Sequence, residues 1–311
     1  MLKHRLLMSA LLIPATIGLF VWDHHLGQRA PILLALVLLI SARCVWELVT
    51  LSRTAGIHPD FPLCWISCWL LIVMAWSRAL FFPESRFRSI DPEMRGLFVL
   101  FVMTFVLLVF NSVRRFSRPT NSREQIPEQV IQPGTHIKNL AVELLIVTYV
   151  GVLLAFTVQL RWSSDMENNK TGYFALGALV VATKMGDVGA YTFGRLIGGP
   201  KMTPKLSPGK TWAGGIGHLV SAGLCSMAWL CWLGPMISWS WHVWGLVPAA
   251  VFGVVVGFAG LIGDLAESLI KRDVGVKDAP ALLPGFGGLL DLVDSLLLAG
   301  PVAYVMWHLL R

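Results

Sequence analysis

The sequence has few charged residues. Only 14% of its 311 positions are Asp, Glu, Lys or Arg, while 55% are hydrophobic, and the mean hydropathy is +0.67. A soluble domain usually carries about 25% charged residues, so this composition excludes an ordinary soluble domain and indicates an integral membrane protein. The 13 Trp and 16 Phe agree with this, because aromatic side chains gather at the membrane–water interfaces.

Paired cysteines, a cleavage site and a repeat are also missing. The five cysteines are odd in number and form no CxxC pair, which excludes a disulfide scaffold or a zinc ribbon and leaves them as small buried hydrophobic residues. No A-x-A-like site follows the first apolar run, so we expect a transmembrane helix there rather than a cleaved signal. No repeat of fixed period is present, which disfavours a transporter built from inverted repeats.

Long apolar runs dominate what is present. Since a helix needs about 20 mostly apolar residues to cross a bilayer, the sequence predicts an all-α integral membrane protein, a polytopic bundle of about nine transmembrane helices. The expected spans are 6–22, 31–50, 63–82, 97–112, 140–160, 173–196, 214–234, 245–268 and 288–309. We expect residues 1–135 to form a hydrophobic N-terminal half with a cytoplasmic linker. Residues 136–311, where charges enter the helices, form the expected catalytic half.

Basic residues are distributed unevenly between the predicted loops. If the N-terminus is inside, fifteen Lys and Arg lie on the inner side and seven on the outer side. The positive-inside rule therefore predicts a cytoplasmic N-terminus and an outer C-terminus. The net charge of +7 is then explained by these loops and by anionic lipid headgroups, so we expect no binding of DNA or RNA.

Ionisable residues inside the predicted spans are the main functional signal, because each is costly in a membrane unless it is paired or hydrated. Lys184, Asp187, Tyr191 and Arg195 follow one another at offsets of three, seven and eleven, which places them on one face of a helix. A Lys–Asp pair that only joins two helices is the plainer alternative for this first cluster.

Two further clusters lie near the C-terminus. Asp264, Ser268, Lys271 and Arg272 fall on one side of the eighth predicted span, and an acid about two turns from two bases can bind a metal ion while the bases bind phosphate. Bases that snorkel from a helix end would explain Lys271 and Arg272 but not Asp264. The third cluster is a glycine-rich loop followed by Asp291 and Asp294 on one face of the ninth span. These acids suggest a divalent-metal site for phosphate chemistry.

The segment Ser207–Trp212 reads Ser-Pro-Gly-Lys-Thr-Trp and ends a basic, glycine-containing loop that could bind polyphosphate. Its Gly-Lys-Thr triplet invites comparison with a P-loop. That motif requires a glycine where this chain has Pro204, and it follows a strand, which we do not expect here.

These residues together resemble the signatures of the phosphatidate cytidylyltransferase family, also called CDP-diacylglycerol synthase. The family motif S-x-x-K-R-x-x-x-x-K-D, followed by P-G-H-G-G-x-x-D-R-x-D, is matched by Ser268, Lys271, Arg272, Lys277, Asp278, Pro284, Gly285, Gly287, Gly288, Asp291 and Asp294. The upstream motifs D-x-x-A-Y-x-x-G-R and S-P-x-K-T-W-E-G are matched by Asp187, Ala190, Tyr191, Gly194, Arg195, Ser207, Pro208, Lys210, Thr211, Trp212 and Gly214. The match covers roughly residues 184–295.

The resemblance implies transfer of a cytidylyl group from CTP to membrane phosphatidic acid in a bacterial-type inner membrane, with the site facing the cytoplasm. The implied partners are CTP, phosphatidic acid and bilayer lipid; a homodimer is compatible with the sequence. Mg²⁺ is the expected cofactor, held by Asp264 and Asp291, with a second, monovalent cation as a further candidate. Lys271 and Arg272 complete the expected catalytic set. The expected substrate-binding residues are Ser207, Lys210, Thr211, Ser268, Lys277, Asp278, Asp187, Tyr191, Arg195 and Asp294.

Three positions depart from the family motifs. Phe286 replaces the motif histidine, Leu292 the arginine, and Ala213 the glutamate. Each change removes a polar group from the expected site. Three alternative hypotheses remain beside a cytidylyltransferase. They are a related CTP-dependent lipid-phosphate enzyme such as a polyprenol kinase, a non-catalytic homologue, and a transporter built around charges at the membrane midplane.

Overall fold

The computed structural model describes most of the chain. The residues it describes are 18–27, 29–77, 91–116, 133–162, 169–237, 244–276 and 287–310. Most of the first predicted span lies outside these ranges. So do Lys277 and Asp278, two of the predicted binding residues, and the motif departure Phe286.

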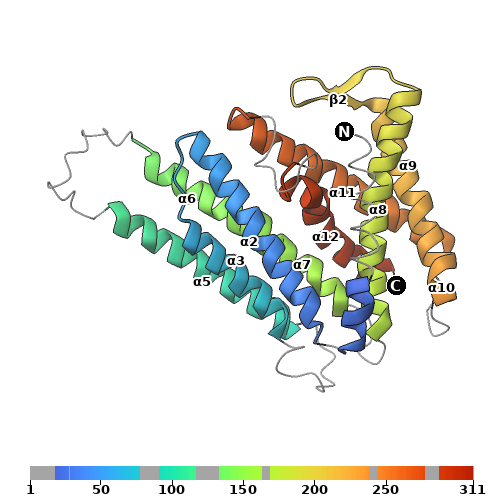
Figure 1. Ribbon diagram of the computed structural model, residues 1–311, viewed down its shortest axis with the longest axis horizontal. Coiled ribbons are helices and arrows are strands. Elements are labelled where there is room, and N and C mark those ends of the chain that lie inside the picture. The colour runs from blue at the N-terminus through green and yellow to red at the C-terminus, as the bar shows by residue number, and fades with distance from the viewer. Residues whose placement is uncertain are drawn as a thin grey trace.

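The N-terminal part of the chain forms one side of the bundle (Figure 1). Its helices include α2 (Pro31–Thr54), α3 (Phe61–Ala75), α5 (Asp91–Phe116), α6 (Thr135–Ile146) and α7 (Leu153–Gln159). A π-helical segment, η1 (Val147–Val152), joins α6 to α7, and a short 3₁₀ turn, η2 (Leu160–Trp162), follows α7. The run from α6 to η2 is therefore one continuous helical rod.

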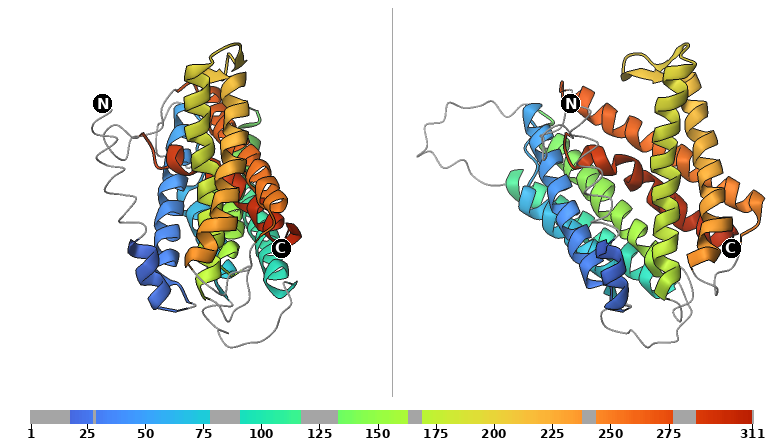
Figure 2. Two further views of the ribbon diagram at one scale, coloured as in Figure 1. Left: turned by 90° about the vertical axis from the view of Figure 1, so that its right-hand side faces the viewer. Right: turned by 45° about the vertical axis from the view of Figure 1, so that its right-hand side comes forward.

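The C-terminal part begins with α8 (Asn169–Leu196) and continues through a small hairpin into further helices. These are α9 (Trp212–Ala228), the π-helical η3 (Trp229–Leu233), α10 (Gly234–Ile237), α11 (Leu246–Asp273) and α12 (Leu290–Leu310). Figure 2 shows α8 and α9 side by side, with α11 and α12 running obliquely between them and the N-terminal helices.

The protein is a helical integral membrane protein, but the predicted count of nine spans is not confirmed. Within the described ranges, six helical stretches are long and apolar enough to cross a bilayer: Pro31–Thr54, Gly96–Phe116, Thr135–Trp162, Trp212–Leu233, Leu246–Asp273 and Leu290–Leu310. The third predicted span contains α3, whose 15 residues are too few. The sixth predicted span corresponds to α8, which has 28 residues. This helix is not among the six because Lys184, Asp187 and Arg195 lower its hydropathy.

The chain is mainly helical, as predicted for an all-α membrane protein, and the described residues also contain one small hairpin. Strands β1 (Lys201–Thr203) and β2 (Ser207–Thr211) pair antiparallel and form a hairpin between α8 and α9. A strand therefore does precede the Gly-Lys-Thr triplet, contrary to our expectation. The triplet still lies within or at the end of β2 rather than in a loop after it, so the hairpin is not a P-loop.

Helix α12 joins the two halves of the bundle. Its Leu290 and Leu297 belong to a buried core shared with α2, α3 and the α6–η1–α7 rod. Its Ala299, Ala303 and Trp307 belong to a second core shared with α8, η3 and α11. Residues on successive turns of one helix therefore bury apolar surface against both halves.

A glycine allows α11 to approach α12 closely. A Cβ atom built on Gly263 would lie 2.6 Å from the carbonyl oxygen of Asp294 and 3.1 Å from the Cα of Ser295. Small residues at such positions let membrane helices pack backbone against backbone. Because this contact pairs Gly263 with residues 294 and 295, it sets the antiparallel register of the two helices.

We predict that Gly263→Ala destabilises the protein by about 1–3 kcal/mol, since the added methyl group overpacks the α11–α12 contact. Thermal unfolding of the purified protein in detergent measures the effect. Gly18→Ala is the matched control, because Gly18 is an exposed helical glycine with nothing within 4 Å of the added atom. Equal midpoints for Gly263→Ala and the unaltered protein would contradict the close approach.

Candidate active site

The helix register determines which acids lie at the same level. With Gly263 against Asp294, Asp264 lies opposite Asp294, with which it interacts electrostatically. One turn further along α11, Glu267 lies beside Asp291. Asp264 is nine residues before the end of α11, about 14 Å along the helix, whereas Asp291 is in the first turn of α12. The two predicted metal ligands are therefore offset by about one helical turn.

Lys271 is shared between two carboxylates. Its Nζ lies 2.6 Å from Glu267 Oε2 and 3.1 Å from Asp291 Oδ1. Glu267 is almost completely buried, with 2% of its side chain exposed. The second oxygen of Asp291 accepts a hydrogen bond from the backbone N–H of Gly288 at 3.1 Å. The glycine-rich loop thus contributes a backbone donor to Asp291 at the start of α12.

The hairpin brings a second base to α11. Lys210 Nζ lies 2.8 Å from Asp264 Oδ2, and Arg272 Nε donates to the carbonyl oxygen of Leu206 at 3.3 Å. These two contacts hold the hairpin over the C-terminal half of α11. The structure therefore brings Lys210 to Asp264, although 54 residues separate them in the sequence, and it brings Arg272 to the same hairpin.

Helix α8 contributes a third set of polar side chains. Lys184 Nζ donates to the carbonyl oxygen of Leu292 and to Ser295 Oγ, both at 3.0 Å, and it lies 3.6 Å from Asp187. The other carboxyl oxygen of Asp187 lies 3.7 Å from Nδ1 of the buried His218, whose Nε2 is 2.9 Å from the Gly257 carbonyl oxygen. The predicted cluster on α8 thus reaches α12 and α9, and not only its own helix.

Several predicted binding residues lie outside these contacts. Arg195 donates a hydrogen bond to Tyr191 at 2.8 Å, and both side chains are exposed. Thr211 is buried, and its hydroxyl accepts the Gly214 N–H at 3.1 Å, so it caps α9. Ser207 and Ser268 are half-buried. Their roles in substrate binding remain predictions.

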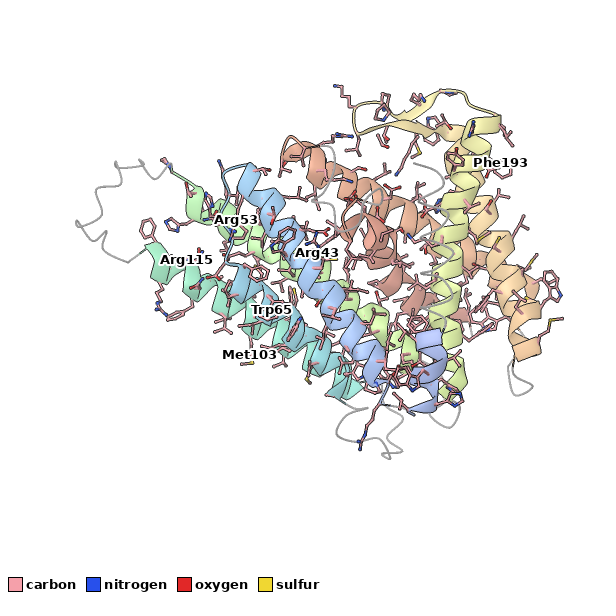
Figure 3. All side chains as sticks on the ribbon, viewed as in Figure 1. Arg43, Arg53, Trp65, Met103, Arg115 and Phe193 are labelled. Atoms are coloured by element: carbon pink, nitrogen blue, oxygen red, sulfur yellow. The ribbon has the colours of Figure 1, made fainter. Side chains whose placement is uncertain are left out.

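Sequence reasoning missed Glu47, which comes from α2 in the N-terminal half. Its side chain is completely buried, and its two oxygens accept the backbone N–H groups of Leu289 and Leu290 at 2.8 and 2.9 Å. Arg43 pairs with it at 2.8 Å, and Figure 3 shows Arg43 on the side of α2 that faces α12. Glu47 therefore holds the first turn of α12, immediately beside Asp291. A lone acid in an apolar run was the signal that could have identified it.

Comparisons with known proteins identify the family of the chain. A model of the cytidylyltransferase family matches residues 3–310. The chain belongs to this family. It is 38% identical over 126 residues to the uncharacterized protein YnbB of Escherichia coli K12, covering 40% of each chain.

Two further relatives are named phosphatidate cytidylyltransferase. The Haemophilus influenzae protein is 35% identical over 148 residues, which is 48% of this chain and 50% of that protein. The Brucella suis protein is 43% identical over 122 residues, which is 38% of this chain and 41% of that protein. The chain spans about half the length of the curated relatives it matches.

The sequence predicts a magnesium ion at this site, and two carboxylates have donor atoms suited to it. Among the described residues, no group of three or more His, Cys, Asp or Glu is arranged to hold a metal on its own. Magnesium, however, is usually bound by one or two carboxylates together with waters and substrate phosphates. Asp264 and Asp291 offer hard oxygen ligands of that kind, and each is held next to an ammonium group.

We predict that Glu47→Ala lowers the free energy of unfolding of this cytidylyltransferase-family protein by about 3–5 kcal/mol, because Arg43 and the backbone amides of Leu289 and Leu290 lose a buried partner. Glu47→Gln should lose less, since its amide oxygen still accepts one hydrogen bond. The exposed Asp273→Asn is the control and should change stability by less than about 0.5 kcal/mol. Thermal unfolding in detergent would reject the capping role if Glu47→Ala matched that control.

Proposed function

We propose that the protein transfers a cytidylyl group from CTP to membrane phosphatidic acid, giving CDP-diacylglycerol and pyrophosphate. The observation that carries this proposal is the arrangement of two acids and three bases where α11, α12 and the hairpin meet. Lys210 on β2 pairs with Asp264, Lys271 on α11 pairs with Asp291, and Arg272 on α11 donates to the hairpin. Such a site suits substrates that are themselves polyanions. The family membership supports the same reaction, and so do two relatives that are named phosphatidate cytidylyltransferase.

In the proposed reaction, a phosphate oxygen of the lipid attacks the α-phosphorus of CTP. The bond between that phosphorus and the oxygen bridging to the β-phosphate breaks, and pyrophosphate leaves with the electron pair. Because two anions must approach each other, the reaction requires positive charge that stabilises the phosphates and residues that hold the two substrates in position. It does not require a covalent intermediate with the protein. Lys210, Lys271 and Arg272 would bind the phosphates of CTP and of the lipid.

Magnesium would be held by Asp264 and Asp291, and when bound it supplies charge neutralisation and orientation of the phosphates. Ser207 would contact the nucleotide through the hairpin, while Thr211 and Asp187 would support the site from α9 and α8. A second, monovalent cation and a homodimer stay predictions. Lys277 and Asp278, from the same motif, are proposed to bind substrate.

The alternative functions differ in what they release from CTP. A CTP-dependent polyprenol kinase would release CDP and not pyrophosphate, and a non-catalytic homologue would release neither. A single assay with CTP, magnesium and vesicles that contain both phosphatidic acid and a polyprenol therefore separates these functions.

We predict that Asp264→Asn and Asp291→Asn each abolish pyrophosphate release from labelled CTP, because each removes a charged oxygen ligand from the proposed magnesium site. Asp273→Asn, an exposed acid on the same helix as Asp264, is the matched control and should keep nearly full turnover. Normal turnover in both proposed ligand variants would reject the site assignment.

We further propose that the N-terminus and the active site face the cytoplasm of a bacterial-type inner membrane, with the C-terminus outside. Described bases gather at the end of the bundle that carries the hairpin, as Figures 1 and 3 indicate for Arg53, Arg115 and β2. At the opposite ends of the helices lie Arg29 and Arg161. The positive-inside rule then favours a cytoplasmic hairpin, on the side where CTP is made.

For this orientation, we predict that Lys205→Cys in the exposed hairpin is not labelled by an impermeant thiol reagent in intact cells and is labelled after lysis. His25→Cys, exposed at the opposite end of the bundle, is the control and should be labelled in intact cells. The native cysteines should add little background, because four are buried and Cys225 is half-buried. Labelling of the Lys205→Cys variant in intact cells would reverse the proposed topology.

A further inference from the structure

Lys184 is placed unusually for a lysine in a long helix of a membrane protein. It lies twelve residues before the end of α8, about 18 Å along the helix, so its ammonium does not belong to the helix end. Its Nζ crosses to α12 and donates to the Leu292 carbonyl oxygen and to Ser295 Oγ, both at 3.0 Å. A base that merely snorkels toward water would not be tied to a neighbouring helix.

The surroundings of Lys184 contain an excess of acids. Asp187 is 3.6 Å away on the next turn of α8, and Asp294 also interacts with the lysine. Asp264 in turn interacts with both Asp187 and Asp294. Lys210 pairs with Asp264 at 2.8 Å. Within the described part of this cluster, Lys184 is the ammonium group that faces Asp187 and Asp294, and Nδ1 of the buried His218 also lies 3.7 Å from Asp187.

The place where Lys184 meets α12 is also a place where the sequence departs from its family motif. The motif reads D-R-x-D, and this chain reads Asp291, Leu292, Val293, Asp294. A positive charge expected on α12 between the two acids is therefore missing. The ammonium of Lys184 is hydrogen-bonded to the backbone of that same residue, Leu292.

We propose that Lys184 is a positioning residue that supplies, from α8, the positive charge which the motif carries at position 292. This inference rests on the proposed function, because it assigns Lys184 to the same site. The ammonium balances Asp187 and Asp294, and it ties α8 to the first two turns of α12. Both effects keep Asp291 and Asp294 opposite Glu267 and Asp264.

The test is an exchange of the charge between the two helices. Lys184→Met should lower kcat by about tenfold or more while the KM for CTP changes by less than about twofold, because the lysine acts on the acids and not on the nucleotide. Adding Leu292→Arg to Lys184→Met should restore kcat to within about threefold of the unaltered protein. Lys184→Met with Leu292→Met is the matched control and should not recover.

Thermal unfolding in detergent, with and without magnesium chloride, gives a second readout that needs no turnover. The midpoint should fall in Lys184→Met and recover with Leu292→Arg but not with Leu292→Met. If Lys184→Met does not fold, the same two double variants still report which one restores the folded yield. This comparison therefore decides the role of the charge even if the unaltered protein releases no pyrophosphate, an outcome that would reject only the proposed function.

Two results would overturn the inference. The first is a Lys184→Met variant with unchanged kcat and midpoint. The second is equal recovery with Leu292→Met and Leu292→Arg, since that would assign the effect of position 292 to packing and not to charge. Recovery that depends on arginine in both measurements supports the proposal.

Discussion

The close approach of α11 and α12 at Gly263 is the constraint on which the rest of the site depends. Because this residue has no side chain, the backbone of α12 lies directly against α11 at Asp294 and Ser295. That one contact sets the register of two antiparallel helices, and the register then decides which acid lies opposite which. Asp264 lies opposite Asp294, and Glu267 lies beside Asp291.

Charges brought so close together in a membrane protein need partners, and the structure supplies each from a different segment. Lys271 on α11 forms ion pairs with Glu267 and Asp291. Lys210 in the hairpin forms an ion pair with Asp264, and Lys184 on α8 donates a hydrogen bond to the backbone of α12. An acid in a poorly hydrated interior is costly unless it is paired or hydrogen-bonded. The same ammonium groups are well suited to bind phosphates, so the features that stabilise the site also prepare it for anionic substrates.

The N-terminal half contributes more than hydrophobic packing. Glu47 on α2 accepts two backbone N–H groups at the start of α12, so the element that carries Asp291 is held from the other half of the chain. The shared core around Leu290 and Leu297 adds apolar contacts to this polar one. Helix α12 is thus fixed by both halves, which couples the stability of the whole bundle to the placement of one carboxylate.

Composition and spacing by themselves determined that the protein is an integral membrane protein and that it resembles the cytidylyltransferase family, and they predicted that its polar chemistry lies in the second half. These conclusions follow from local quantities: the lengths of apolar runs, the rarity of charges within them, and motifs that can be read along the chain. Composition did not determine the number of spans in the same way, because α3 is short and the charges of α8 lower its apolar character.

Only the tertiary structure decided how these residues meet. The pairing of Lys210 with Asp264, the capping of α12 by Glu47 and the contact of Lys184 with Leu292 join residues that are 54, more than 240 and 108 positions apart. No helical periodicity encodes such contacts, since periodicity describes one helix and not the register between two. The register depends on where the backbones of two helices can approach each other. In this protein α11 and α12 approach at Gly263, and only their packing in three dimensions reveals that contact.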